Sequence, residues 1–217
     1  MSFYWIKTNR FIKWIFPNYI WDIPSQTNQI YLTFDDGPIP QITDWVLTEL
    51  EKHNAKATFF CIGKNIEAHP HIFGNIVNGG HAIGNHTYNH LNGWKTTTTD
   101  YLQNIELCKK VIEKYTKSST NHSKRSYFRP PYGKIKSSQA KELEKLGYKI
   151  IMWDVLSADF DQSISKEKCL KNVISNIEAG SIIVFHDSAK AFKNLKYTLP
   201  KVLAYLDQNH FTYETLR

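Results

Sequence analysis

The chain has 217 residues, enough for one sizeable hydrophobic core in a single domain. Hydrophobic residues make up 41% and charged residues 22% of the chain, close to globular averages, which excludes a disordered protein. The formal net charge of +7 favours approach to an anionic polymer or membrane surface. The lysines are scattered through apparent helices without any nucleic-acid-binding signature, so we expect no nucleic-acid partner.

The cysteines and the apolar segments limit the classes further. Cys61, Cys108 and Cys169 are an odd number at wide spacings, which predicts buried, reduced thiols rather than a disulfide framework or a cysteine zinc site. No apolar run approaches the roughly 18 residues of a membrane span, and no signal peptide is visible. We therefore expect a cytoplasmic protein or one bound peripherally to a membrane.

Residues 1–29 form an extension in which aromatic and basic residues are interleaved. Its large apolar residues are Phe3, Tyr4, Trp5, Ile6, Phe11, Ile12, Trp14, Ile15 and Phe16, and its basic residues are Lys7, Arg10 and Lys13. One hypothesis is an amphipathic segment that lies in a lipid interface. We favour the alternative, in which the aromatic side chains pack on the domain of residues 30–217 and close one end of it.

From residue 30 onward, predicted strands alternate with predicted helices. In chain order these are a strand at 30–34, a helix at 42–50, a strand at 57–61, helical residues up to 77, a strand at 82–84, a helix at 102–112, a strand at 127–128, a helix up to 146, a strand at 149–153, a helix at 170–180, a strand at 181–185, a helix at 199–206 and a strand at 211–216.

This alternation implies right-handed crossovers and a mainly parallel sheet. About seven such units favour an α/β fold in the form of a distorted, incomplete (β/α) barrel, although a doubly wound sheet has the same spacing and stays open. In both architectures the ligand site lies beyond the carboxyl ends of the strands.

Polar residues follow the predicted strands at those ends. The first pair is Asp35 and Asp36, in the turn that continues with Gly37 and Pro38. A turn with a helix cap is one explanation, since Asp suits cap positions. Two adjacent carboxylates nevertheless repel one another unless a metal or Arg129 compensates their charge.

His90 follows His86 by four positions. On one helical turn this spacing lets both imidazoles bind the same ion, whereas a pair of surface histidines is the simpler interpretation of the isolated motif. No cysteine is nearby, so two histidines and an aspartate are the natural ligand set. Such a set leaves a position open for water, as in catalytic zinc sites.

Three further polar residues each have an ordinary explanation when taken singly. Arg129 could pair with a surface carboxylate, Tyr132 could cap the core, and His186 could be a buried histidine with satisfied hydrogen bonds. Their joint arrangement with Asp159 and the residues above favours catalysis. A carboxylate base, three metal ligands, an arginine, another histidine and another carboxylate together supply the parts needed for metal-assisted amide hydrolysis.

Four ordered motifs carry a family resemblance. They are Thr33-Phe34-Asp35-Asp36-Gly37-Pro38, the segment 86–90, Arg129-Pro130-Pro131-Tyr132 and Val184-Phe185-His186. Over about residues 30–216 the chain resembles the polysaccharide deacetylases of the NodB-homology, carbohydrate esterase 4 class. The resemblance implies the distorted (β/α) barrel of the NodB-like deacetylase fold.

The resemblance also implies a role for each residue of these motifs. Asp36, His86 and His90 would hold a divalent metal, commonly Zn²⁺, with Co²⁺ or another divalent ion as the alternative. Asp35 would be the general base and Arg129 would hold it in place.

On the other side of the substrate, His186 would protonate the departing amine and Asp159 would orient and charge His186. The backbone N–H of Tyr132 would help to stabilise the oxyanion. The residues expected to contact substrate are Pro131, Tyr132, Phe160 and Val184.

Two motifs depart from the family pattern. Leu156 stands where an acidic residue is usual, Phe160 replaces a tryptophan, and Val184 replaces a common leucine. We expect these apolar positions to shape the acetyl pocket.

The leading hypothesis is metal-dependent removal of acetyl groups from N-acetylated amino sugars of a polysaccharide such as peptidoglycan or a chitin-like glycan. Hydrolysis of a small amide or a lipid-linked amino sugar is an alternative within the same chemistry. A non-catalytic carbohydrate-binding module on the same scaffold is a third, since fold alone does not fix function.

Overall fold

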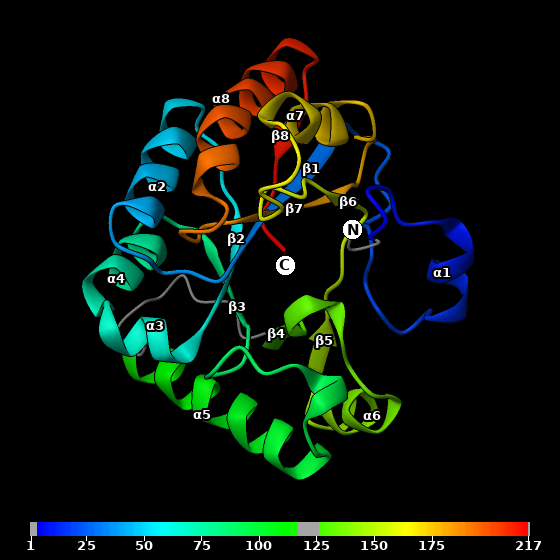
Figure 1. Cartoon of the computed structure of the whole chain (residues 1–217), viewed down its shortest axis with the longest axis vertical. Helices are drawn as coiled ribbons and strands as arrows, with labels where there is room; N and C mark the ends of the chain where they lie inside the picture. The colour runs from blue at the N-terminus through cyan, green and yellow to red at the C-terminus, as the bar shows by residue number, and fades with distance from the viewer. Residues whose placement is uncertain (1–3, 117–125, 217) are drawn as a thin grey trace.

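The computed structural model describes residues 4–116 and 126–216, and a single parallel sheet organises them (Figure 1). The strands are β1 (Gln29–Asp35), β2 (Thr58–Cys61), β3 (Ala82–Asn85), β4 (Ser126–Phe128), β5 (Tyr148–Ile150), β6 (Val155–Leu156), β7 (Ile182–His186) and β8 (Thr212–Tyr213). Their order is β5-β4-β3-β2-β1-β7-β6, with β8 paired to β1 off this path. All of these pairings are parallel.

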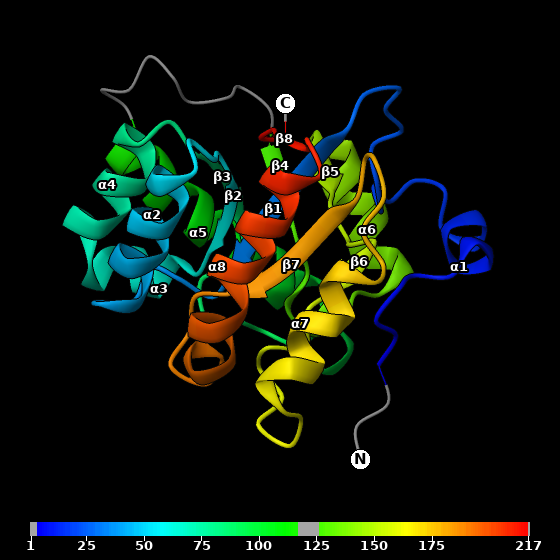
Figure 2. The ribbon, with the colours of Figure 1, turned by 90° about the horizontal axis from the view of Figure 1, so that it is seen from above.

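Helices surround the strands as the alternation predicts. They are α1 (Arg10–Ile15), α2 (Ile42–Lys52), α3 (Gly63–Ala68), α4 (Pro70–Asn78), α5 (Thr98–Thr116), α6 (Ser137–Lys145), α7 (Lys166–Ile174) and α8 (Phe192–Gln208). Short 3₁₀ turns lie at Gly93–Lys95 and Pro131–Gly133. Figure 2 shows α2 to α5 grouped on one side of the strands, α7 and α8 in front, and α6 on the other side.

The predicted fold class, a distorted and incomplete (β/α) barrel, is confirmed. Two details of the prediction were wrong. β6 is too short to give a sequence signal, so it was not predicted. The helix expected to reach Gly180 ends at Ile174, and Ile177 packs against the core from the loop that follows.

The main core lies between the sheet and the outer helices. β1 contributes Ile30, Leu32 and Phe34 to it, each fully buried. Alternate residues point to the barrel interior, where Tyr31 packs in a separate apolar cluster. Cys61, Cys108 and Cys169 are free and buried, as predicted.

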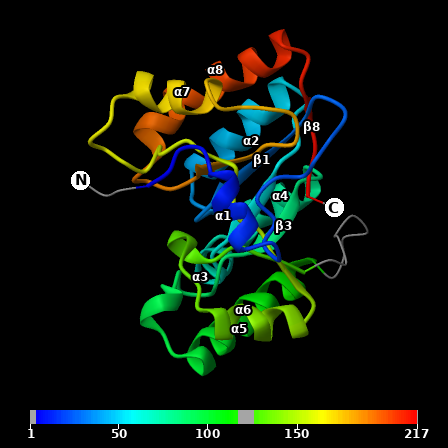
Figure 3. The same cartoon turned by 90° about the vertical axis from the view of Figure 1, so that its right-hand side faces the viewer.

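The N-terminal extension lies where the barrel is open, between the edge strands β5 and β6. Ile20 bridges to Ile151 directly after β5, and Lys7 bridges to Val155 of β6. Figure 3 shows α1 in front of this side, between the α7–α8 and α5–α6 pairs. The extension therefore spans the gap between the two sheet edges.

The aromatic side chains of the extension differ in their exposure. Trp21 is buried and Tyr4 packs on Phe160, whereas Phe11 and Trp14 are 61% and 74% exposed. Six-residue α1 contains no buried residue, so its aromatic face remains open. Phe3 lies outside the described residues. In the described parts of the chain, no helix combines the length and apolar character of a membrane span.

Candidate active site

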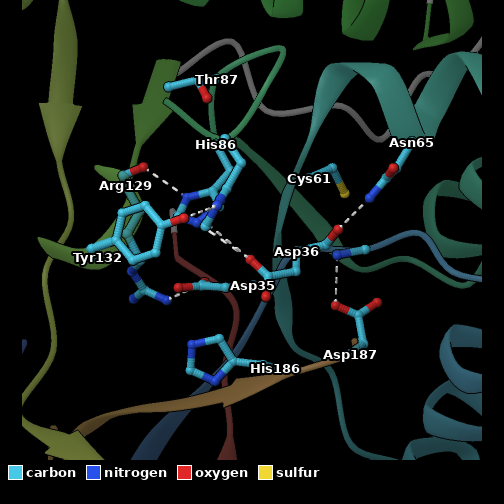
Figure 4. Close-up of polar contacts among 12 residues, drawn as sticks. Asp35, Asp36, Cys61, Asn65, His86, Thr87, Arg129, Tyr132, His186 and Asp187 are labelled. Atoms are coloured by element: carbon cyan, nitrogen blue, oxygen red, sulfur yellow. Dashed lines mark hydrogen bonds and ion pairs between the residues drawn. The ribbon is translucent and has the colours of Figure 1, made fainter. Parts of the chain in front are cut away.

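The parallel register of β1 and β7 places two of the predicted site residues side by side. Asp35 pairs with His186 at the carboxyl ends of these strands, on the face that points into the barrel. Figure 4 shows Asp35 directed toward the Arg129 guanidinium, with His186 across the same space. The period of two along each strand is what brings both side chains to the mouth of the barrel.

Arg129 orients the carboxylate of Asp35. Its Nη1 donates to Asp35 Oδ1 and to Thr33 Oγ1, both at 2.7 Å. Its Nε and Nη2 donate to the carbonyls of Ile151 and Met152 at 3.3 and 2.8 Å. The guanidinium is fully buried, so the carboxylate receives a compensating charge that water does not screen.

Three predicted metal ligands converge beside this pair. One ligand atom each from Asp36, His86 and His90 lies within 4.8 Å of the other two. The Nε2 atoms of His86 and His90 lie 3.8 and 3.2 Å from Asp36 Oδ1. In a tetrahedral site with metal–ligand bonds of about 2.0–2.2 Å, ligand atoms are roughly 3.4 Å apart. The three residues therefore fit a single divalent ion.

The tautomer of His86 supports this assignment. Its Nδ1 lies 2.8 Å from the carbonyl oxygen of Arg129, which only accepts, so Nδ1 carries the proton. Burial lowers the pKa of His86 to about 4, and the ring is neutral at pH 7. Its Nε2 lone pair then faces the carboxylate of Asp36. Two such acceptors repel one another unless a cation lies between them.

The prediction that a helical turn brings the two histidines together was wrong. Residues 86–90 form an irregular loop, and Thr87 and His90 have φ angles of 63° and 56°. The loop curls the chain back so that the two imidazole ring centres are 5.1 Å apart. The spacing therefore predicted correctly that the two histidines lie close together, but a loop and not a helical turn brings them there.

The left-handed backbone region recurs around the mouth of the barrel. Non-glycine residues with positive φ here are Asp36, Thr87, His90, Tyr132 and Ala158. Such conformations are strained for residues with a Cβ and cluster at functional sites.

His186 and Asp159 form the second acid–base pair. The imidazole Nδ1 lies 2.7 Å from Asp159 Oδ1, and the His186 backbone N–H donates to Asp159 Oδ2 at 2.8 Å. Burial works against the imidazolium, but the charge and hydrogen bond of fully buried Asp159 prevail and raise the pKa of His186 to about 9. His186 is therefore a cation at neutral pH.

These groups surround a cavity of about 460 Å³. The residues lining it are Tyr4, Asp35, Asp36, His86, His90, Pro130, Tyr132, Gly133, Trp153, Leu156, Phe160, Val184, His186, Ser188 and Lys190. Tyr132, Phe160 and Val184 thus lie where the sequence predicted. Pro131 does not line the cavity, because the neighbouring Pro130 takes that place. Arg129 and Asp159 lie behind the wall and act on it through Asp35 and His186.

The family model described as polysaccharide deacetylase matches residues 22–151, more than half of the chain. The chain belongs to the polysaccharide deacetylase family. A peptidoglycan-N-acetylglucosamine deacetylase of Bacillus cereus is 31% identical over 197 residues, which cover 90% of each protein. A second B. cereus protein of the same description is 35% identical over 170 residues, and the match covers 78% of this chain and 60% of that relative.

Solved structures agree with this assignment to the polysaccharide deacetylases. The chain resembles the crystal structure of the Bc1960 peptidoglycan N-acetylglucosamine deacetylase in complex with 4-naphthalen-1-yl-N-oxidanyl-benzamide. The TM-score is 0.85 with 31% identity, and the match covers 94% of both chains.

In this polysaccharide deacetylase, two residues that the sequence did not indicate hold the turn that carries Asp35 and Asp36. Asp187 is fully buried and accepts from the backbone N–H of Gly37 at 2.9 Å and from Thr43 Oγ1 at 2.6 Å. Asn65 donates to the carbonyl of Asp36 at 2.7 Å (Figure 4). Asp187 directly follows His186 in sequence, and that adjacency was the available signal.

Proposed function

We propose that this chain is a metal-dependent hydrolase that cleaves the N-acetyl amide of amino sugars in a polysaccharide and releases acetate. One observation carries the proposal. A three-residue metal site, a base paired with arginine and an imidazolium paired with aspartate all line one cavity. This is the set of groups that amide hydrolysis requires, because water must be activated and the amine must be protonated to leave.

Asp36, His86 and His90 are the residues that would hold the metal, and the ligand set fits Zn²⁺ best because it combines two imidazoles with a carboxylate. When bound, the ion supplies Lewis acidity toward the acetyl carbonyl and lowers the pKa of a coordinated water. A lowered pKa of Asp36 favours its ligating form: burial opposes ionisation, but the neighbouring imidazoles outweigh it.

Asp35 takes the proton from the attacking water. Its Oδ1 is held by Arg129 at 2.7 Å, so the carboxylate is oriented toward the cavity before substrate arrives. The backbone N–H of Tyr132 donates no hydrogen bond to any residue in the described parts of the chain, which leaves it free for the developing oxyanion.

His186 gives its proton to the departing amine. Because its pKa is raised to about 9, it is loaded with that proton at neutral pH, and Asp159 holds the ring in the donating orientation. The base and the acid stand on adjacent strands. The acetyl group therefore fits between them, with Leu156 and Val184 as apolar neighbours for its methyl group.

The substrate class follows from the cavity together with the relatives. The two B. cereus relatives are named for deacetylation of peptidoglycan N-acetylglucosamine. A mostly apolar cavity of about 460 Å³ has room for an amino-sugar residue. We propose N-acetylglucosamine units of peptidoglycan or a chitin-like glycan as the substrate.

The test uses Zn²⁺-reconstituted protein with N-acetylglucosamine oligomers and with peptidoglycan, followed by acetate release and mass spectrometry for loss of an acetyl group. Asp35→Asn should abolish turnover and keep the metal, whereas Asp36→Asn should lose the metal. Asp100→Asn, an exposed aspartate outside the cavity, is the matched control and should behave as wild type. Full turnover by Asp35→Asn would refute the assigned mechanism.

A further inference from the structure

The N-terminal extension pairs with the edge of the catalytic sheet. The Thr8 N–H donates to the Asp154 carbonyl, and the Leu156 N–H donates to the Ile6 carbonyl, both at 2.8 Å. The bridge between Lys7 and Val155 is antiparallel. Running backward from Thr8, the extension therefore travels toward the carboxyl end of β6. Tyr4, two residues beyond Ile6, lines the same cavity as Asp35 and His186.

A buried carboxylate holds the extension in this position. Lys7 Nζ donates to Asp154 Oδ2 at 2.6 Å, to Glu178 Oε1 at 2.7 Å and to the Asn176 carbonyl at 2.9 Å. Lys13 donates to the other oxygen of Asp154 at 2.7 Å. The Asp154 side chain has no exposed surface, so these contacts are weakly screened and fix the strand register.

The side chain of Tyr4 lines the cavity. Its hydroxyl donates to Asp161 Oδ2 at 2.6 Å, and its ring packs edge-to-face on Phe160 with centroids 5.6 Å apart. Phe160 in turn packs edge-to-face on His186 at 5.0 Å. Tyr4 and Phe160 thus form one continuous aromatic wall, which ends at the proposed acid.

We infer that the N-terminal extension is part of the substrate site and that Tyr4, with Phe160, contacts the apolar face of a sugar ring. This inference rests on the proposed function. Aromatic rings provide large, rigid contact surfaces in ligand cavities, and the C–H face of a pyranose is the complementary surface of a glycan. The family match begins at residue 22, so Tyr4 lies outside the segment that the family model describes.

A purely structural role for Tyr4 makes a different prediction. If the side chain served only to anchor the extension, its loss would lower thermal stability and leave substrate affinity unchanged. The Asp161 hydrogen bond and the ring contact can be separated, because Tyr4→Phe removes only the hydroxyl. Trp14, an aromatic residue of the same extension that is 74% exposed and outside the cavity, provides the matched control.

The experiment measures kcat and KM for acetate release from N-acetylchitotetraose by wild type, Tyr4→Ala, Tyr4→Phe and Trp14→Ala. Tyr4→Ala should raise KM about tenfold with kcat within about twofold of wild type, the size of one aromatic contact. Tyr4→Phe should retain most of the affinity, and Trp14→Ala should match wild type. An unchanged KM in Tyr4→Ala overturns the inference and leaves the proposed function intact.

A second arm is independent of turnover. Binding of the same oligomer to metal-free protein is measured by calorimetry, with circular dichroism to verify that each variant is folded. Should wild type release no acetate, the proposed function fails, and a tenfold weaker Kd in Tyr4→Ala still supports the aromatic wall. An equal Kd in Tyr4→Ala, or no calorimetric binding by wild type, overturns the inference.

Discussion

Replacing Arg129 by methionine tests the charge balance around Asp35, the proposed base. Methionine keeps a comparable apolar volume but removes the donors to Thr33 Oγ1, Asp35 Oδ1 and the Ile151 and Met152 carbonyls. The cation also lies over the Phe60 ring, with the guanidinium carbon 4.1 Å from the ring centre. Asp35, only 3% exposed, is then left without its counter-charge.

The expected cost follows from this burial. Removing one partner of a buried, hydrogen-bonded ion pair costs about 3–5 kcal/mol, because the remaining charge stays desolvated. For a domain of 150–250 residues this corresponds to a decrease in Tm of roughly 6–20 °C. We expect deacetylation to be lost as well, since the base is no longer oriented.

The assay is urea and thermal unfolding followed by circular dichroism, with Asp35→Asn/Arg129→Met as the control. The double variant removes both charges, so it should be more stable than Arg129→Met alone. A loss below about 1 kcal/mol in Arg129→Met, or a double variant that is less stable still, would refute the reasoning.

Three further predictions concern the proton, the metal and the turn. Since the pKa of His186 is raised from 6.5 to about 9, turnover should decline as pH rises through 9. The stability that protonated His186 contributes, complete below pH 6.5, should be lost over the same rise, and a flat pH–rate profile from pH 7 to pH 10 would contradict this. Zn²⁺ at a hundred times its Kd should raise Tm by roughly 5–11 °C in wild type and not in His90→Ala, as read by scanning calorimetry. In Gly37→Ala the new Cβ would lie 1.9 Å from Asp187 Oδ2, so unfolding in urea should show a loss of about 1–3 kcal/mol, whereas wild-type stability would disprove the clash.

The sequence predicts that the candidate catalytic residues come together, because parallel strands all end at one edge. Asp35 and His186 each follow an apolar strand, and in a parallel sheet this alone brings them to the same mouth. The prediction of a partial barrel and of Asp36 near the two histidines rests on the same geometry. Local signals are sufficient wherever the position of a residue depends only on where its strand ends.

Features that depend on distant pairing could not be predicted in this way. β6 has two residues, and it is stabilised by β7 on one side and by the N-terminal extension on the other. The Lys7–Asp154 contact joins residues separated by 147 positions. Hydrophobic periodicity carries no information about such partners, which explains why Tyr4 was assigned to the extension and not to the cavity.

The loop of residues 86–90 shows how a strained ligand geometry is maintained. Left-handed conformations at Thr87 and His90 cost on the order of 1–3 kcal/mol each. Side-chain amides offset this cost: Asn85 Oδ1 accepts from the Thr87 N–H at 2.9 Å, and Asn104 Oδ1 accepts from the N–H groups of residues 88–89 at 2.8 and 3.0 Å. Because these bonds do not involve a metal, the loop is preorganised. Binding of the metal therefore does not have to supply the free energy of ordering the loop. An Asn104→Leu variant removes this support and should weaken Zn²⁺ binding, measured by competition with a chelator. Unchanged Zn²⁺ affinity in this variant would show that the loop does not need the Asn104 hydrogen bonds.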